Sequence, residues 1–383
     1  MGDARAPYEH ILIIVPVPEP QEIIADLKKK HPHVKITYVQ QTFEKGEIRN
    51  LQDIPDGRSI DPAFVEHHTD RQFTELFFDA TILVTLSTLP RNIKLIPNLK
   101  LIHVISAGVD RLADTPIWKE TNITITNSSG IHGPQIAEWV ILQILANAHK
   151  EKTMLEWQKR HHWGSHYALG TVEDGVGQRL GVLGYGAIGR QTARIAKAMG
   201  YDVIAYTATP KDTAEKKKDR GYIVPGTGDP DGLFPSAWYS GLDKESLHNF
   251  LTQDLDVLLV SVPLTPQTTH FLAAPEFALL GKKGAFVANI ARGKVLQQDD
   301  LIAALRKSRE DGGLRGAALD VTDPEPLPED SELWDLENVA VTPHVSGVGG
   351  TYVERCFGVL EQNLTRLERG ERLLNVVDRK KGY

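Results

Sequence analysis

The sequence predicts an α/β fold made of two doubly wound parallel-sheet domains. Short runs rich in β-branched and aliphatic residues alternate with helical patterns through the first 130 residues. The same alternation restarts near Leu180, and a helical stretch follows the last expected strand. Strands that alternate with amphipathic helices are typical of parallel sheets whose two faces are covered by helices.

The first part of the chain indicates a small α/β domain. Residues 20–30 and 62–79 have helical spacing, and the second stretch opens with Asp61 as N-cap and Pro62 at the first helical position. The expected strands are 10–17, 34–40, 81–87, 101–106 and 123–127.

The second part starts after a long apolar helix, residues 135–149, which Gly133 and Pro134 precede. We expect this helix to bridge the two domains. The expected strands that follow are 180–183, 201–207, 256–263, 285–291, 314–321 and 339–342, and the expected helices are 187–199 (closed by Gly200), 299–309 and 352–369.

The order of these elements predicts that one domain is inserted into the other. The helix at 352–369 would return to the first domain and close it. We therefore expect a domain made of residues 1–130 plus 350–383, and a second domain of residues 131–349 placed between its two parts.

Residues 225–241 interrupt the alternation. The segment is rich in glycine, proline and aspartate and then aromatic at Phe234, Trp238 and Tyr239, and it is longer than a usual connection between helix and strand. Its aromatic end favours packing against its own domain or a partner subunit over service as a lid on a ligand cleft.

Composition excludes several classes of protein. The net charge of −7 and the pI near 6.1 disfavour a nucleic-acid-binding protein, and the basic run Lys216 to Lys218 is short enough to be a solvated loop or helix face. Cys356 is the single cysteine, so neither an internal disulfide nor a thiolate metal site is expected. The sequence has no signal-peptide layout, and no apolar run approaches a membrane span. Alanine at position 6 argues against myristoylation of Gly2. We expect a cytoplasmic protein without metal.

A glycine loop lies at the start of the second alternation. It comprises Gly184, Tyr185, Gly186, Ala187, Ile188 and Gly189, between an expected strand and an expected helix. In this context Gly184 allows a tight turn, Gly186 lets the backbone approach a pyrophosphate, and Gly189 lets the helix pack closely. The helix N-terminus attracts the negative charge. The pattern predicts a dinucleotide site.

The strand that follows the loop bears on the choice of cofactor. NAD sites place an acidic residue at the end of this strand to hold the ribose 2′-hydroxyl, and here that place holds Thr207. Thr209 offers a hydroxyl, and Lys211 offers a charge that suits a 2′-phosphate. We therefore predict NADP(H) as the preferred cofactor, with NAD(H) possible; the alternative is that Lys211 is an exposed lysine and both cofactors bind.

Three residues downstream supply the chemistry for reduction of a 2-keto acid. Arg292 follows an expected strand and can bind a carboxylate with its planar fork. His344 follows the last strand and can donate a proton near neutral pH. Glu325, between Pro324 and Pro326, can accept the other imidazole N–H and favour the charged ring, although a solvated carboxylate in an acidic stretch is the alternative.

Five ordered motifs carry a resemblance to a known family. They are Gly-Tyr-Gly-Ala-Ile-Gly at 184–189, Val-Pro-Leu-Thr-Pro-Gln-Thr at 262–268, Asn-Ile-Ala-Arg-Gly at 289–293, Ala-Leu-Asp-Val-Thr-Asp-Pro-Glu-Pro at 318–326 and Thr-Pro-His-Val-Ser-Gly at 342–347. With Ile-Ala-Glu-Trp at 136–139 and Ser-Ala-Gly-Val-Asp at 106–110, the sequence resembles the D-isomer-specific 2-hydroxyacid dehydrogenase family. The resemblance implies a Rossmann-type cofactor domain inserted into a flavodoxin-like substrate domain.

The resemblance also implies roles for particular residues. It makes Arg292 the substrate anchor, His344 the general acid and Glu325 its partner, with backbone amides at Ala107 and Gly108 binding the substrate carboxylate. It places Asp320 and the carbonyl of Ile290 at the nicotinamide carboxamide. The remaining cofactor contacts that it implies are Tyr185 to Ile188 over the pyrophosphate, Val262, Pro263 and Thr268 beside the adenosine half, and Ala291 and Gly347 elsewhere along the cofactor.

Two functions remain open from the sequence. The first is an NADP(H)-preferring reductase that converts a 2-keto acid to a D-2-hydroxy acid, working as a homodimer that closes its two domains over a small-molecule substrate. The second is a dinucleotide-sensing binding protein, similar to a corepressor, on the same scaffold. The absence of basic or low-complexity tails favours the enzyme. Residues 157–163, rich in aromatic side chains, are a candidate dimer surface.

Overall fold

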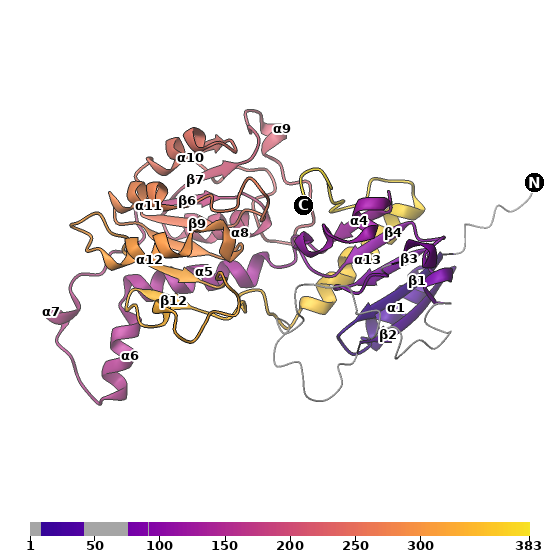
Figure 1. Cartoon of the computed structure of the whole chain (residues 1–383), viewed down its shortest axis with the longest axis horizontal. Coiled ribbons are helices and arrows are strands. Elements are labelled where there is room, and N and C mark those ends of the chain that lie inside the picture. Colours follow the sequence, from indigo (N-terminus) through magenta and orange to yellow (C-terminus); the bar gives the residue numbers. More distant parts are fainter. Residues whose placement is uncertain (1–8, 42–75, 91) are drawn as a thin grey trace, which may run out of the picture. The chain divides into compact units, whose positions relative to one another are not determined.

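The computed structural model of the chain describes residues 9–41, 76–90 and 92–383. The chain divides into two compact units, of which unit 1 comprises Met1–Ile131 with Gly350–Tyr383 and unit 2 comprises His132–Gly349. Each unit is a parallel β-sheet with helices packed on it (Figure 1). The predicted α/β class with two doubly wound parallel sheets is confirmed.

The sheet of unit 1 has the strand order β2-β1-β3-β4-β5, and every described pair is parallel. This is the flavodoxin-like order. The expected helix at 62–79 lies mostly outside the described residues, and residues 76–79 are helical. The main elements are β1 (Glu9–Val15), α1 (Gln21–Lys30), β2 (Val34–Gln40), β3 (Ile82–Thr85), β4 (Leu101–Val104), α4 (Pro116–Glu120), β5 (Thr124–Asn127) and α13 (Tyr352–Glu368).

The sheet of unit 2 has the order β12-β11-β10-β9-β6-β7-β8, again with parallel pairs. Strand order reverses at β6, which lies between β9 and β7, and such a switch point is where Rossmann-type sheets bind ligands. The strands are β6 (Arg179–Leu183), β7 (Asp202–Thr207), β8 (Ala237–Ser240), β9 (Val257–Val260), β10 (Phe286–Asn289), β11 (Gly316–Leu319) and β12 (Val339–Val341). The helices are α5 (Gly133–Ala148), α6 (Glu151–Lys159), α7 (His166–Leu169), α8 (Ala187–Ala198), α9 (Ala214–Lys217), α10 (Lys244–Leu251), α11 (Ala274–Gly281) and α12 (Gln298–Arg306).

Each face of the unit 2 sheet has its own hydrophobic core. Side chains alternate along a strand, so Leu183 packs with α10, α11 and α12, while Val182 packs with α5 and α8 on the opposite face. All four residues of β9 are buried, as expected for a strand covered on both sides. This double layer holds the carboxyl ends of the strands rigidly in place.

The 225–241 segment packs on its own domain. Its last part forms β8, a strand that the sequence analysis did not identify because the run is only four residues long. The Trp238 ring meets Tyr185 edge to face at 5.0 Å, and the Tyr239 ring lies 5.7 Å from Phe250. The segment therefore packs within unit 2 and adds the edge strand β8 to its sheet beside β7.

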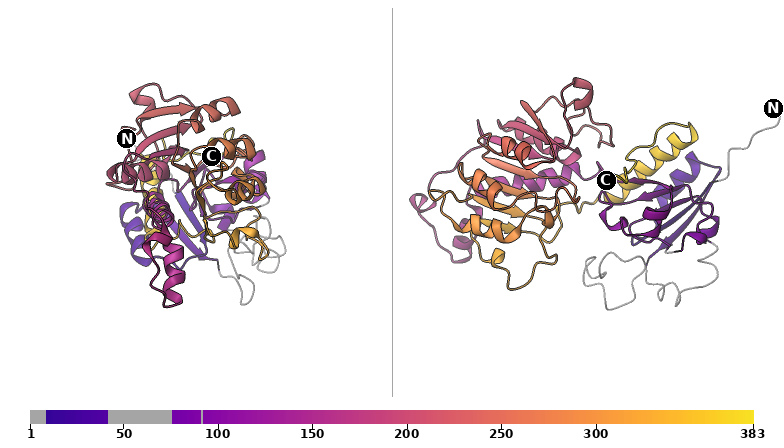
Figure 2. Two further views of the ribbon diagram at one scale, coloured as in Figure 1. Left: turned by 90° about the vertical axis from the view of Figure 1, so that its left-hand side faces the viewer. Right: turned by 45° about the horizontal axis from the view of Figure 1, so that its top comes forward.

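Helices α6 and α7 extend away from the sheet of unit 2 (Figure 2). Their apolar side chains find little cover within the chain, since Trp163 is 98% exposed and Tyr167 is 85% exposed. Met154 and Leu155 on α6 are also exposed. Among the helices described, none is long and apolar enough to cross a membrane.

Candidate active site

The three predicted chemical residues follow three neighbouring strands. Arg292 comes after β10, Glu325 after β11 and His344 after β12, and these strands lie side by side in parallel. Carboxyl ends of parallel strands meet at one edge of a sheet. The fold therefore brings all three residues, which are up to 52 positions apart in the sequence, to the same edge of unit 2.

His344 and Glu325 are in direct contact. The imidazole Nδ1 lies 2.7 Å from the Glu325 Oε1, and the two side chains are 41% and 26% exposed. A carboxylate oxygen only accepts hydrogen bonds, so the contact makes Nδ1 a protonated nitrogen of the ring. The contact is made by Nδ1 and not by Nε2, which lies on the other side of the ring.

Asp320 orders the loop that carries His344. Its carboxylate is 2% exposed and accepts hydrogen bonds from the Thr342 hydroxyl at 2.6 Å, the Val345 amide at 2.9 Å, and both the amide and the hydroxyl of Ser346. The His344 amide donates to the Asp320 carbonyl at 2.9 Å. His344 itself has a φ of +54°, a left-handed conformation that is uncommon for non-glycine residues.

The Asp320 carboxylate is held by the protein's own loop. Both of its oxygens accept hydrogen bonds from donors of residues 342–346. These contacts support the loop that carries His344, and the implied contact of Asp320 with the nicotinamide carboxamide stays a prediction.

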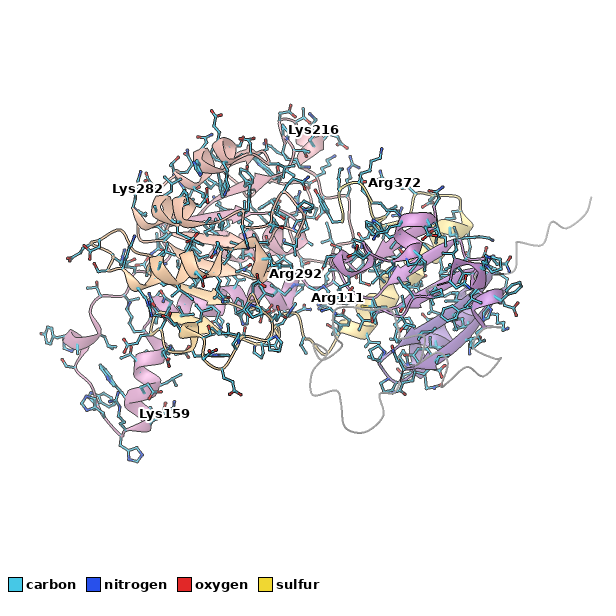
Figure 3. The ribbon with its side chains drawn as sticks, viewed as in Figure 1. Arg111, Lys159, Lys216, Lys282, Arg292 and Arg372 are labelled. Atoms are coloured by element: carbon cyan, nitrogen blue, oxygen red, sulfur yellow. The ribbon has the colours of Figure 1, made fainter. Side chains whose placement is uncertain are left out.

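Arg292 sits on a turn organised by Asn289. The fully buried Asn289 side chain accepts from the Ala291 amide at 3.0 Å and donates to the Arg292 carbonyl at 3.2 Å. The Arg292 guanidinium, labelled in Figure 3, donates to the Ala291 carbonyl at 2.8 Å. Gly293 lies against the backbone of Thr322, where a Cβ atom would collide, so the Arg292 turn touches the loop that leads to Glu325.

The glycine loop has the geometry that the sequence predicted. Gly184 has a φ of +104°, and a Cβ there would lie 2.6 Å from the Ser261 carbonyl oxygen. A Cβ on Gly189 would lie 2.5 Å from the Gly184 oxygen. At Gly186, the N-cap of α8, no heavy atom lies within 4 Å of the Cβ position. Gly184 and Gly189 are therefore needed for internal packing, whereas Gly186 leaves open space beside the N-terminus of α8.

Tyr185 contributes only its backbone to this loop surface. Its ring is 4% exposed and its hydroxyl donates to the Asp229 carboxylate at 2.8 Å. Burial and then the bond to Asp229 raise the pKa of Tyr185 above its ordinary value. Asp229 also accepts from the amides of Leu233 and Phe234, so the 225–241 segment is fastened beneath the glycine loop.

The end of β7 opens into a basic depression of about 450 Å³. Thr209 and Lys211 line it together with Lys216, Lys218 and Arg220. Two acids of the same stretch form ion pairs with these cations. Asp212 pairs with Lys216, and Glu215 pairs with Lys218 and Arg220. The Thr207 hydroxyl donates to the Thr209 carbonyl at 2.8 Å, and its contact with the cofactor stays a prediction.

The other candidate cofactor residues flank the same edge. Thr268 is buried, and its hydroxyl donates to the Pro263 carbonyl at 2.7 Å, which closes the loop that Val262 begins. The Ile290 amide donates to the carbonyl of Val260, the last residue of β9. The Gly347 carbonyl accepts from the Gln135 side chain at 3.2 Å.

Ala107 and Gly108 belong to unit 1, in the loop after β4. The Asn127 side chain donates to the Ala107 carbonyl at 2.8 Å, and the Ser106 hydroxyl donates to the Gly108 carbonyl at 2.8 Å. The preceding Ile105 carbonyl accepts from the Tyr352 hydroxyl at 2.7 Å. The carbonyls of this loop are thus engaged by the protein.

Sequence reasoning did not identify Arg190, Asp229 or Asn289 as parts of this edge. The position of Arg190 indicated a buried partner, because a cation in the first turn of a helix interacts unfavourably with the helix dipole unless acceptors compensate it. Asp229 had none, since aspartate is ordinary in a glycine-rich loop. No cluster of His, Cys, Asp or Glu suited to a metal ion occurs among the described residues.

The fold and the site define the class of protein, an oxidoreductase built on a dinucleotide-binding sheet. The model of the D-isomer specific 2-hydroxyacid dehydrogenase NAD binding domain matches residues 141–225 and 235–346, more than half of the chain. A glyoxylate reductase of Korarchaeum cryptofilum is 28% identical over 78% of this chain and 83% of its own length. A D-3-phosphoglycerate dehydrogenase of Methanocaldococcus jannaschii is 30% identical over 81% of this chain and 54% of its own.

Solved structures agree with these sequence matches. The crystal structure of a D-isomer specific 2-hydroxyacid dehydrogenase from Xanthobacter autotrophicus Py2, in complex with NADPH and MES, is 26% identical with a TM-score of 0.71. The match covers 98% of this chain and 100% of that one. The chain belongs to the D-isomer specific 2-hydroxyacid dehydrogenase family. It is an NAD(P)-dependent oxidoreductase of keto and hydroxy acids.

Proposed function

We propose that the protein reduces a small 2-keto acid to the D-2-hydroxy acid, reversibly, with NADPH as the preferred cofactor. The observation that carries the proposal is the 2.7 Å contact between His344 and Glu325 at the sheet edge that also carries Arg292. This edge supplies a proton donor after β12 and a carboxylate anchor after β10, with Glu325 following β11 between them. The alternative of a dinucleotide sensor is not favoured, because the matched relatives named above are a reductase and dehydrogenases.

The residues present fit a nicotinamide dinucleotide. The open space at Gly186 admits a pyrophosphate against the N-terminus of α8, where amide dipoles favour anions. The backbone of Tyr185 to Ile188 would hold the pyrophosphate, and the loop of Val262 to Thr268 would flank the adenosine half. When bound, the cofactor supplies the hydride.

The protein's own part in the reaction is binding and proton transfer. Arg292 binds the carboxylate of the keto acid with two guanidinium N–H groups and polarises the carbonyl, since its planar fork matches a carboxylate. His344 gives the proton on Nε2 to the carbonyl oxygen as negative charge develops there. Glu325 holds Nδ1–H and stabilises the imidazolium. Backbone amides at Ala107 and Gly108 are the further carboxylate donors in this scheme.

The preference for NADPH rests on the end of β7. No carboxylate stands at Thr207 to hold a ribose 2′-hydroxyl, and the cations that line the adjoining depression suit a phosphate. The Xanthobacter autotrophicus relative is crystallised with NADPH. Thr209 and Lys211 are the residues that we assign to the 2′-phosphate.

Removal of the anchor or of the proton donor tests the reaction. In Arg292→Ala we expect kcat/KM for the keto acid to fall about 10³-fold or more, because a charge-assisted contact and carbonyl polarisation are lost together.

In His344→Ala we expect kcat to fall by about 10² to 10⁴ with little change in the cofactor dissociation constant. Stopped-flow NADPH oxidation and fluorescence titration measure both quantities, and near wild-type turnover in either variant would contradict the mechanism.

The cofactor preference has its own test. Lys211→Ala should lower kcat/KM for NADPH about tenfold, because one charge-assisted contact to the 2′-phosphate is lost, and leave kcat/KM for NADH nearly unchanged. Lys282→Ala removes an exposed lysine of the same unit after α11 and serves as the control. Equal losses with both cofactors, or comparable wild-type rates with NADH and NADPH, would reject the assigned phosphate site.

We also propose that the protein is a homodimer joined through unit 2. The exposed Trp163 and Tyr167 near α6 and α7 form an apolar surface that the chain itself does not cover. Trp163→Ser with Tyr167→Ser should weaken self-association by at least tenfold, as aromatic residues dominate interface energies. Sedimentation velocity over a concentration series measures this, with exposed Phe78→Ser in unit 1 as the control; a monomeric wild-type protein at all concentrations would refute the proposal.

A further inference from the structure

We propose that Arg190 is a positioning residue that sets the preference for a 2′-phosphate, by holding residues 216–220 in place beside the cofactor loop. We call residues 216–220 the basic segment. The inference rests on the proposed function, because it concerns how unit 2 recognises the cofactor. Arg190 follows the last glycine of the loop and lies in the first turn of α8.

The Arg190 side chain ties three elements together. It is 4% exposed, although it carries a charge. Its Nη2 donates to the Lys217 carbonyl at 2.6 Å, its Nη1 donates to the Asp229 carbonyl, and its Nε lies 3.5 Å from the Asp219 carboxylate. One planar group thereby links α8 to the basic segment on one side and to the 225–241 segment on the other.

Alternate residues of the basic segment have opposite surroundings. Lys216, Lys218 and Arg220 are exposed and line the depression at the end of β7 (Lys216 is labelled in Figure 3). Lys217 and Asp219, between them, are half-buried and contact Arg190 through a carbonyl and a carboxylate. Fixing the two inner residues therefore fixes the direction in which the three cations project.

The 225–241 segment holds the basic segment from its other side. The Asp219 amide donates to the Pro230 carbonyl at 2.8 Å, and the Lys217 ammonium lies 5.7 Å from the centre of the Trp238 ring. Gly232 has a φ of +68°, and a Cβ there would lie 2.6 Å from the Lys217 oxygen. The basic segment is thus clamped between α8 and the long segment, which gives that segment a role in cofactor recognition.

The chemistry of arginine explains why this position needs it. A cation in the first turn of α8 opposes the helix dipole, and burial adds to its cost. Two carbonyl oxygens and a carboxylate offset both, and Nη1, Nη2 and Nε of the planar guanidinium each meet one of them. Lysine carries all its donors on one nitrogen, so we expect it to hold the basic segment less firmly. Mobile cations lose conformational entropy when they bind an anion, so clamping them favours the phosphate.

The test compares two nucleotides that differ only in the 2′-phosphate. Calorimetric titration of the full chain with adenosine 2′,5′-bisphosphate and with adenosine 5′-phosphate gives the ratio of the two affinities without any turnover. We expect the wild-type protein to prefer the bisphosphate. In Arg190→Met and in Arg190→Lys the ratio should fall about tenfold, the loss of roughly one charge-assisted contact, while the affinity for the monophosphate stays within about twofold.

A matched control lies one turn along the same helix. Arg194 donates to the Gly228 carbonyl at 3.2 Å, so it contacts the long segment where Arg190 contacts the basic segment. Arg194→Met should leave the ratio unchanged. If Arg190→Met fails to fold, Asp219→Asn decides instead, because it removes the ion pair without emptying a buried volume and should lower the ratio in the same direction.

The outcomes separate this inference from the proposed function. A wild-type preference that survives in Arg190→Lys and Asp219→Asn, or equal losses for both nucleotides, overturns the role of Arg190 alone. Equal wild-type affinities for the two nucleotides overturn both that role and the preference for NADPH. Absence of keto acid turnover with an intact, Arg190-dependent ratio overturns only the proposed reaction.

Discussion

The candidate site depends most on the buried carboxylate of Asp320. His344 adopts a left-handed backbone conformation, and the Asp320 carboxylate holds the residues on either side of it, Thr342 on one side and Val345 with Ser346 on the other. These bonds hold the loop in which the imidazole lies 2.7 Å from Glu325. Charge-assisted hydrogen bonds to backbone amides are among the stronger ones in proteins, so a single buried side chain can fix the loop that carries the proton donor.

A second constraint comes from the sheet itself. Because its strands are parallel, their carboxyl ends share one edge, and glycine at 184, 189 and 293 lets the loops at that edge lie directly on neighbouring backbone. The proposed catalytic residues follow β10 to β12, while the glycine loop and the basic depression follow β6 and β7. The proposed chemistry and the proposed cofactor recognition therefore occupy two halves of one edge, and the buried polar groups of Arg190 and Asp229 lie in the second half.

The sequence was sufficient for the fold and for much of this edge. Strand and helix periods located β6, α8 and β9 to within a few residues, because apolar runs and glycine positions are local signals. The pairing of His344 with Glu325 was inferred from residue type, and the structure places the two in contact. The bonds that the side chains of Asp320, Tyr185 and Thr268 make to the protein could not be predicted, because tertiary hydrogen-bond partners leave no trace in spacing. The assignment of these residues to the cofactor stays a prediction. The strand β8 was missed because four residues carry too little periodicity.

The central claim is that this chain reduces a 2-keto acid by hydride transfer. The most direct measurement is the stoichiometry and chirality of product formed when NADPH is mixed with the protein and each of glyoxylate, hydroxypyruvate, pyruvate, phenylpyruvate and branched 2-keto acids. We predict that at least one acid is consumed mole for mole with NADPH, and that every chiral product is the D-2-hydroxy acid. Tight nucleotide binding with no NADPH consumed on any acid, or an L-configured product, would contradict the account.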